Sequence, residues 1–132
     1  MPRVLVVDDD PMVGAAIEVC LKRKGFDVTV ADGGEAGMVA LEERSFDVML
    51  IDVFMPHMSG FESIRIFHER APGIPIIAMS GYAFANAERA PDFLRMTLEL
   101  GAARCLRKPF TPAALITTVN ECLGQSAARG RF

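Results

Sequence analysis

The chain has no long apolar run, no basic run and no paired cysteines. Its longest hydrophobic stretches are of strand length, such as residues 4–7, far below the roughly 20 residues that span a bilayer. That stretch begins close to Met1 and leads into three aspartates, a pattern that no signal peptide has. The net charge of −3 is spread without a basic cluster. We therefore expect a cytoplasmic protein that contacts neither membrane nor nucleic acid directly.

Cysteine and histidine are sparse and scattered. Cys20, Cys105 and Cys122 are odd in number and form no CxxC pair, which argues against a zinc site or a disulfide framework. We interpret them as small, buried hydrophobic side chains in a reducing cytosol. His57 and His68 have no second ligand at metal-binding spacing and no nucleophile beside them, so we expect neither to carry chemistry.

The hydrophobic pattern predicts a parallel α/β domain. Continuous apolar runs at 4–7, 26–30, 48–51, 74–79 and 104–106 alternate with segments of helical spacing. Continuous runs, rather than alternating ones, are typical of parallel strands that are covered on both faces. Five such units within 132 residues fit a flavodoxin-like, doubly wound, five-stranded parallel sheet of order 2-1-3-4-5 with five helices.

Capping residues and glycines mark the ends of the expected helices. The predicted starts are Asp10–Pro11, Ser59 with Glu62, and Thr111–Pro112, and the predicted stops are Gly25, Gly101 and Gly124. The fourth helix is expected at residues 93–100. These boundaries place one domain at residues 1–124 and a short flexible tail at residues 125–132.

Polar side chains gather where the predicted strands end. In an open parallel sheet, ligands bind beyond the carboxyl ends of the strands. The residues at those ends are Asp8, Asp9 and Asp10 after the first strand, Asp52 at the third, Ser80 at the fourth and Lys108 after the fifth. We expect them to form one site.

This set of residue types predicts metal binding and phosphoryl chemistry. Two carboxylates about 4 Å apart repel by roughly 4 kcal/mol at an effective dielectric near 20, so such a cluster must take up protons or hold a cation such as Mg²⁺. Asp10 is better explained as a helix N-cap than as a ligand. Asp52 should be largely enclosed and can attack phosphorus to form an aspartyl-phosphate. That reaction needs mainly positioning and charge neutralisation, which Lys108 and Ser80 can supply.

Five segments, in order along the chain, resemble the motifs of response-regulator receiver domains. They are Val6-Val7-Asp8-Asp9-Asp10, Ile51-Asp52-Val53-Phe54-Met55-Pro56, Ser59-Gly60, Met79-Ser80-Gly81 and Lys108-Pro109-Phe110. The resemblance covers residues 3–123. It implies a phospho-accepting switch of a bacterial two-component system or phosphorelay, in the manner of single-domain chemotaxis regulators.

The resemblance also implies a role for each site residue. Asp52 is the phospho-acceptor and a metal ligand, and Asp9 is a direct Mg²⁺ ligand. Asp8 acts through a metal-bound water, and the backbone carbonyl of Phe54 completes the protein's share of the coordination. Ser80 is the hydroxyl that turns towards the phosphoryl group. Lys108 pairs with that group, and the Lys108–Pro109 peptide is expected to be cis.

The sequence departs from the family pattern in three places. Cys105 stands where receiver domains usually carry the aromatic residue that turns inward on activation, so another side chain or a backbone movement must replace that step. The stretch around residues 82–92 is longer than usual and is either a partner-recognition loop or a tolerated insertion. Phe54 and Tyr82 follow Asp52 and Ser80 by two residues, and we expect their rings to hinder the attacking water and slow dephosphorylation.

These features predict a signalling switch rather than an enzyme, one that catalyses only its own phosphoryl transfer and dephosphorylation. The donor would be a histidine kinase or a histidine phosphotransfer protein. Phosphorylation would change affinity for a downstream protein, or for a second copy in a homodimer, through the face formed by the fourth helix, fifth strand and last helix. An effector domain could be attached at either end.

Two alternatives remain. A pseudo-receiver that binds partners without taking phosphate is supported only by Cys105. A phosphatase that uses an aspartyl-phosphate would need a second aspartate where Phe54 stands, and usually a cap domain that this length cannot hold.

Overall fold

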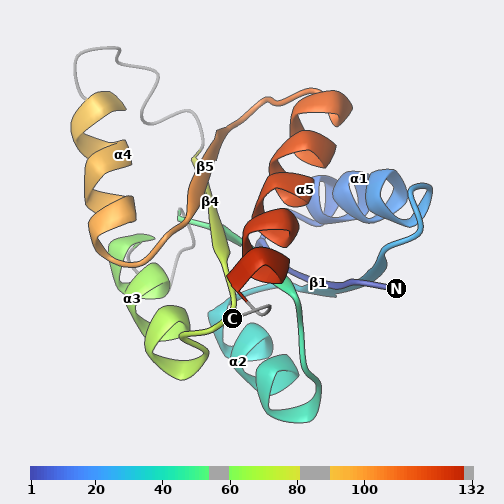
Figure 1. Ribbon diagram of the computed structural model, residues 1–132, viewed down its shortest axis with the longest axis horizontal. Coiled ribbons are helices and arrows are strands. Elements are labelled where there is room, and N and C mark those ends of the chain that lie inside the picture. The colour runs from blue at the N-terminus through green and yellow to red at the C-terminus, as the bar shows by residue number, and fades with distance from the viewer. Residues whose placement is uncertain (54–59, 81–89, 130–132) are drawn as a thin grey trace.

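The computed structural model describes residues 1–53, 60–80 and 90–129, and within them it contains a five-stranded parallel sheet (Figure 1). The strands are β1 (Arg3–Val7), β2 (Asp27–Ala31), β3 (Val48–Asp52), β4 (Ile76–Ser80) and β5 (Arg104–Arg107). They pair in the order β2-β1-β3-β4-β5, and each pairing is parallel. The predicted fold class and strand order are therefore confirmed.

Helices cover both faces of this sheet. They are α1 (Pro11–Lys22), α2 (Gly34–Glu43), α3 (Gly60–Arg70), α4 (Ala90–Glu99) and α5 (Pro112–Arg129). α1 and α5 pack on one face, and α2 and α3 pack on the other, with the end of α4 (Figure 1). This arrangement explains why the strands are continuous apolar runs, since successive side chains enter two different cores.

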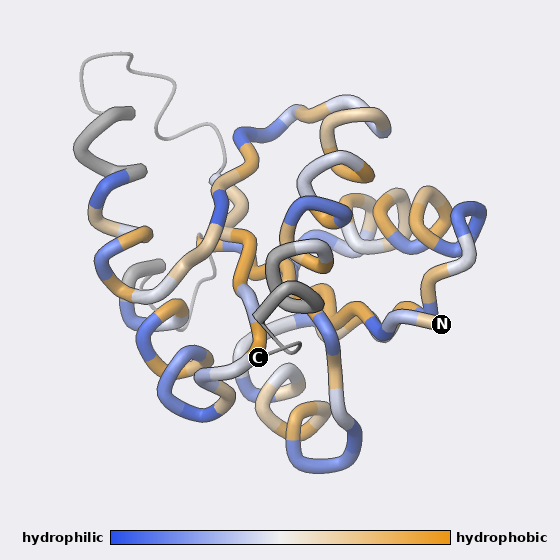
Figure 2. Tube along the Cα trace, viewed as in Figure 1, coloured by the Kyte–Doolittle hydropathy of each residue, from blue (hydrophilic) through white to orange (hydrophobic). Residues whose placement is uncertain are grey.

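β1 illustrates the division into two cores. Val4 and Val6 point into the core beneath α1 and α5, whereas Leu5 and Val7 point into the core beneath α2 and α3. All of them are completely buried. Hydrophobic residues accordingly concentrate along the strands, while polar ones lie mainly in the turns and on the outer sides of the helices (Figure 2). Burial of apolar surface on both faces is what holds the sheet in its layered form.

Most of the predicted helix ends agree with the structure. The Asp10 carboxylate accepts a hydrogen bond from the backbone N–H of Met12 at 3.0 Å, so it caps α1 as expected. The Thr111 hydroxyl accepts one from the backbone N–H of Ala114 at 3.0 Å at the start of α5. Gly25, with φ 89°, closes the turn after α1. Ser59, the other predicted cap, lies outside the described residues.

The predicted end of the last helix was wrong. α5 continues through Gly124 to Arg129. A glycine inside a helix costs about 1 kcal/mol relative to alanine, but it keeps its N–H and carbonyl and does not break the hydrogen-bond ladder. The domain boundary at residue 124 and the flexibility of residues 125–132 remain predictions.

Gly101 ends α4 for a reason that a substitution can test. Its φ is 121°, and a β-carbon placed on it would collide with the ring of His68 on α3. Gly101→Ala should therefore lower the free energy of unfolding by about 2–4 kcal/mol, from backbone strain and overpacking together. Denaturant titration measures this. Gly73→Ala is the matched control, because nothing lies within 4 Å of the added methyl group. Equal midpoints for the two variants would contradict the packing described here.

Candidate functional site

The carboxyl ends of four strands meet at one edge of the sheet, and the predicted polar residues lie there. Asp8 follows β1, Asp52 ends β3, Ser80 ends β4 and Lys108 follows β5. The strand register brings β4 and β5 together, and the backbone N–H of Lys108 donates to the Ser80 carbonyl at 2.7 Å. Residues separated by up to a hundred positions in the chain thus form one site.

Three carboxylates form the acidic part of this site. Asp8, Asp9 and Asp52 each offer an oxygen, and these oxygens all lie within 4.8 Å of one another. Asp8 and Asp52 are almost fully buried, with 1% and 3% of their surface exposed, whereas Asp9 is exposed. Mutual repulsion at such separations favours a bound cation. The set of hard oxygen donors is of the kind that Mg²⁺ or Ca²⁺ accepts.

Lys108 supplies the positive charge beside these carboxylates. Its ammonium lies 2.6 Å from Oδ2 of Asp8 and 3.5 Å from Oδ2 of Asp52. The lysine side chain is only 17% exposed, so water screens these pairs weakly. One ammonium balances one of the three carboxylates, which leaves a formal charge of about −2. The site is therefore an acidic pocket with a lysine on one side.

Asp8 is held firmly by the protein. Its Oδ1 accepts a hydrogen bond from the backbone N–H of Asp10 at 2.9 Å, and its Oδ2 accepts the one from Lys108. Asp10 instead turns to the backbone of Met12 and is not part of the acidic cluster. The structure thus separates the three consecutive aspartates, with Asp8 anchored to the protein, Asp9 facing solvent and Asp10 capping the helix.

Ser80 and the residues after Lys108 complete the described part of the site. Ser80 is buried, with 5% of its surface exposed. The Lys108–Pro109 peptide is cis, as predicted. Phe54 and Tyr82, for which a backbone ligand and a shielding role were predicted, lie outside the described residues, as does His57.

Cys105 occupies β5 opposite Ala78 of β4. Its Sγ lies 3.0 Å from Oγ1 of Thr97 on α4, and either atom can be the donor. Burial raises the pKa of the Cys105 thiol, and the Thr97 hydroxyl partly offsets that rise. Burial also raises the pKa of Cys122, and all three cysteines are free thiols. Only Cys122 is fully buried, whereas Cys20 and Cys105 are partly exposed, so the prediction of buried hydrophobic cysteines is confirmed for Cys122 alone.

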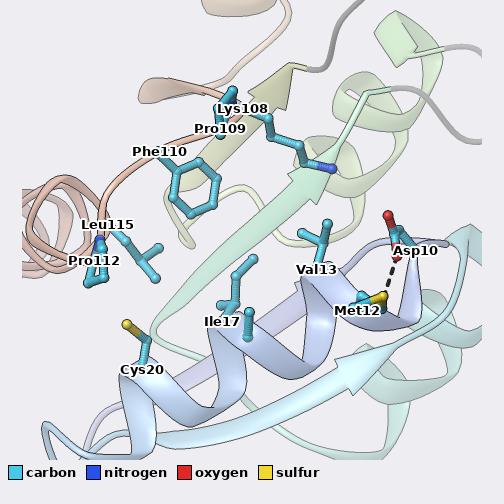
Figure 3. A pocket seen from close by; sticks show the side chains of 11 residues that line it. Asp10, Met12, Val13, Ile17, Cys20, Lys108, Pro109, Phe110, Pro112 and Leu115 are labelled. Carbon is cyan, nitrogen blue, oxygen red and sulfur yellow. Dashed lines mark hydrogen bonds between the residues drawn. The ribbon is translucent and has the colours of Figure 1, made fainter.

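A pocket of about 500 Å³ adjoins the acidic site and was not anticipated from the sequence. Figure 3 shows Val13, Ile17 and Cys20 of α1 on one side and Phe110 and Leu115 on the other. Lys108 and Asp10 line its end nearest the carboxylates, so the pocket and the acidic site share a border. Its walls come from residues 10–20 and 108–115. These segments are close only after folding, so no local sequence pattern predicts the pocket.

Comparison with known proteins agrees with this geometry. The sequence profile described as "Response regulator receiver domain" matches residues 4–120. The chain therefore belongs to the receiver-domain family of two-component response regulators. Within the described residues, no helix combines the length and hydropathy that crossing a bilayer requires.

Relatives of this chain include proteins that are longer than it. The chain is 32% identical over 121 residues to the DNA-binding response regulator MtrA of Mycolicibacterium smegmatis, covering 92% of this chain and 50% of that protein. It is 33% identical over 128 residues to the sensor protein GacS of Pseudomonas syringae pv. syringae, covering 93% of this chain and 14% of that protein. The chain thus spans half or less of the length of these relatives.

A solved structure matches along its whole length. The CheY-like receiver domain protein from Methanospirillum hungatei JF-1 superimposes with a TM-score of 0.86 at 28% identity, and the alignment covers 98% of each chain. The agreement extends the similarity from the motifs to the arrangement of the sheet and helices.

Proposed function

We propose that this receiver domain accepts a phosphoryl group on Asp52 in a Mg²⁺-dependent reaction, and that phosphorylation switches a protein-interaction surface. The observation that carries the proposal is the convergence of Asp8, Asp9, Asp52 and Lys108 at one edge of the sheet. A buried carboxylate beside an ammonium and two further carboxylates is poised for charge-assisted phosphoryl transfer.

Asp52 is the nucleophile in the proposed reaction. One of its carboxylate oxygens attacks phosphorus, the bond from phosphorus to the donor's imidazole nitrogen breaks, and the electron pair of that bond stays on the nitrogen. The Lys108 ammonium, 3.5 Å from Asp52, stabilises the negative charge that arrives with the phosphoryl oxygens. Ser80, at the end of the neighbouring strand, supplies a hydroxyl donor at the same edge.

The carboxylates suit a resident Mg²⁺ ion. As the family resemblance implies, Asp9 and Asp52 would bind it directly and Asp8 through water, and both Asp8 oxygens also accept hydrogen bonds from the protein. When bound, the ion would neutralise the uncompensated charge of the cluster and of the incoming phosphoryl group.

The relatives suggest which class of protein supplies the phosphoryl group. GacS is a sensor protein that contains a region similar to this chain, which supports a histidine kinase or a histidine phosphotransfer protein as the donor. A cytoplasmic location follows from that partnership. The chain would be a signalling switch and not an enzyme acting on a separate substrate.

Output would pass through the face formed by α4, β5 and α5. This face exposes Met96 and Leu98 on α4 and an ion pair at 3.4 Å between Arg104 and Glu121. A downstream protein, or a second copy of this chain, could bind such a mixed apolar and charged surface. MtrA is named as DNA-binding, but we propose that any nucleic-acid contact here would need a further domain.

Intact-protein mass spectrometry tests the proposal. The folded chain is incubated with a small-molecule phosphodonor, with and without Mg²⁺. A gain of one phosphoryl group that requires Mg²⁺ is the expected result. No gain under either condition, with the protein shown to be folded by circular dichroism, would favour a pseudo-receiver, for which Cys105 is the supporting feature.

A further inference from the structure

In the part of helix α4 whose side chains the structure describes, the side chain that faces the sheet is polar. Among its described side chains, residues 95–99, Thr97 is fully buried while its neighbours are exposed. Met96 and Leu98 on either side of it are 44% and 49% exposed. In this part of the helix, the side chain that enters the protein is therefore a threonine hydroxyl and methyl group, not a large hydrophobic residue.

The Thr97 hydroxyl contacts the thiol of Cys105 on β5. The two heavy atoms lie 3.0 Å apart, which is close for a hydrogen bond that involves sulfur. Burial keeps the Cys105 thiol neutral by raising its pKa, so it can either donate to Thr97 or accept from it. A single neutral hydrogen bond makes a small net contribution, so this contact can be broken and re-formed at modest cost.

β5 connects this contact to the site. Cys105 lies three residues before Lys108 on a strand that is hydrogen-bonded to β4, with Cys105 opposite Ala78. The backbone N–H of Lys108 also donates to the Ser80 carbonyl at 2.7 Å. A shift of Lys108 would therefore pass along the short segment of β5 that is paired with β4 and reach the sulfur that contacts Thr97.

Lys108 has two competing partners. Its ammonium is at 2.6 Å from Asp8 and at 3.5 Å from Asp52. A phosphoryl group on Asp52 would add negative charge on the more distant side and draw the ammonium away from Asp8. In the conformation described here, Lys108 pairs with Asp8 and Thr97 contacts Cys105. Phosphorylation of Asp52 would destabilise this conformation.

We propose that the Thr97–Cys105 hydrogen bond couples helix α4 to the phosphorylation site and stabilises the conformation in which Lys108 pairs with Asp8. This inference rests on the proposed function, since it concerns how phosphorylation of Asp52 reaches α4. It assigns the switching role of the missing aromatic residue to a contact between helix α4 and strand β5. Thr97 and Cys105 are positioning residues, because neither touches the reacting atoms.

The proposal predicts that breaking the contact makes the phosphorylated conformation easier to reach. The affinity of Asp52 for a phosphoryl mimic rises in proportion to the population of the competent conformation. Cys105→Ala and Thr97→Val should each increase the affinity for beryllium fluoride with Mg²⁺ by about three- to tenfold. The double variant should increase it no further than either single variant, because each single variant already removes the Thr97–Cys105 contact.

Three controls separate coupling from a packing defect. Cys105→Ser and Thr97→Ser keep a donor and an acceptor, so they should bind the mimic as the wild type does. Cys122→Ala removes another buried sulfur, but from the core beneath α1 and α5, and should also leave the affinity unchanged. In amide NMR spectra without the mimic, signals of residues 95–107 in Cys105→Ala should lie displaced towards their mimic-bound positions.

The outcomes distinguish the two proposals. If the wild type does not bind beryllium fluoride with Mg²⁺ at all, the proposed function and this inference both fail. If the wild type binds it and the variants at positions 97 and 105 bind it equally well or more weakly, the coupling fails and the proposed function stands. Additive effects in the double variant would also overturn the coupling.

Discussion

Replacing Asp52 with asparagine is expected to abolish stable phosphorylation of the protein. The amide oxygen of asparagine carries no formal charge and is a far weaker nucleophile than a carboxylate oxygen. Asp52 is also almost fully enclosed, with 3% of its surface exposed, and its Oδ2 lies 3.5 Å from the Lys108 ammonium. After incubation with a small-molecule phosphodonor and Mg²⁺, intact mass spectrometry should detect the added phosphoryl group on the wild type and not on Asp52→Asn.

The control for this variant is Asp10→Asn, which makes the same change at another aspartate near this edge of the sheet. Asparagine caps helices about as well as aspartate does, and Asp10 is outside the acidic cluster, so this variant should be phosphorylated like the wild type. Asp52→Asn itself should remain folded, because it keeps the side-chain volume and removes one of three mutually repelling charges. Phosphorylation of Asp52→Asn at the wild-type level would mean that another residue is the acceptor.

The fold could be predicted because its strands are buried on both faces. β3, with every residue buried, reads as a continuous apolar run that ends in a carboxylate. β5 gave the weakest signal, since Arg104 and Arg107 flank its short apolar centre, yet it pairs with β4 as expected. Parallel order then follows from the intervening helices and the right-handed crossover rule.

The residues of the site could be predicted because topology places them. Once the strand order is known, the residues after β1, β3, β4 and β5 must share one edge, whatever their side chains do. Asp8, Asp9, Asp52, Ser80 and Lys108 were all expected there, and the structure brings them together.

The side-chain pairings at that edge could not be predicted. The sequence associates Lys108 with a phosphoryl group on Asp52, but the ammonium is closer to Asp8. The Thr97–Cys105 contact depends on how α4 is rotated against β5, and the apolar pocket depends on the approach of residues 108–115 to α1. All three features depend on how closely separate segments of the chain pack together, and the sequence pattern of each segment does not determine that distance.

The extent of α5 is a different kind of error. A glycine near the end of a helical pattern often marks the stop, but only when the backbone turns to positive φ at or near it. Gly25 and Gly101 have positive φ, whereas Gly124 does not and lies inside the helix. The residue type alone does not distinguish a glycine that ends a helix from one inside it, because the difference lies in the backbone conformation and contacts of the residues that follow.

Replacing Lys108 with alanine is expected to slow phosphorylation by about 10²–10³-fold without preventing the binding of Mg²⁺. Loss of one donor to a developing anion typically costs that much in rate. Mg²⁺ binding should persist or tighten, because Asp8, Asp9 and Asp52 remain and the competing ammonium is gone. The rate of mass gain at saturating phosphodonor, with Mg²⁺ affinity measured by calorimetry, separates the two effects.

The same substitution should make folding depend on a divalent ion. Asp8 and Asp52 would stay buried without the ammonium that pairs with them, and removal of one partner from a buried ion pair typically costs about 3–5 kcal/mol. Mg²⁺ binds the folded site and not the unfolded chain, so it should restore part of that loss in denaturant titrations. Lys24→Ala, at an exposed position outside the site, should change neither rate nor stability. The role of the lysine would be contradicted if Lys108→Ala were phosphorylated at the wild-type rate and, without Mg²⁺, were as stable as the wild type. The carboxylates and their ion would then supply all of the electrostatic stabilisation.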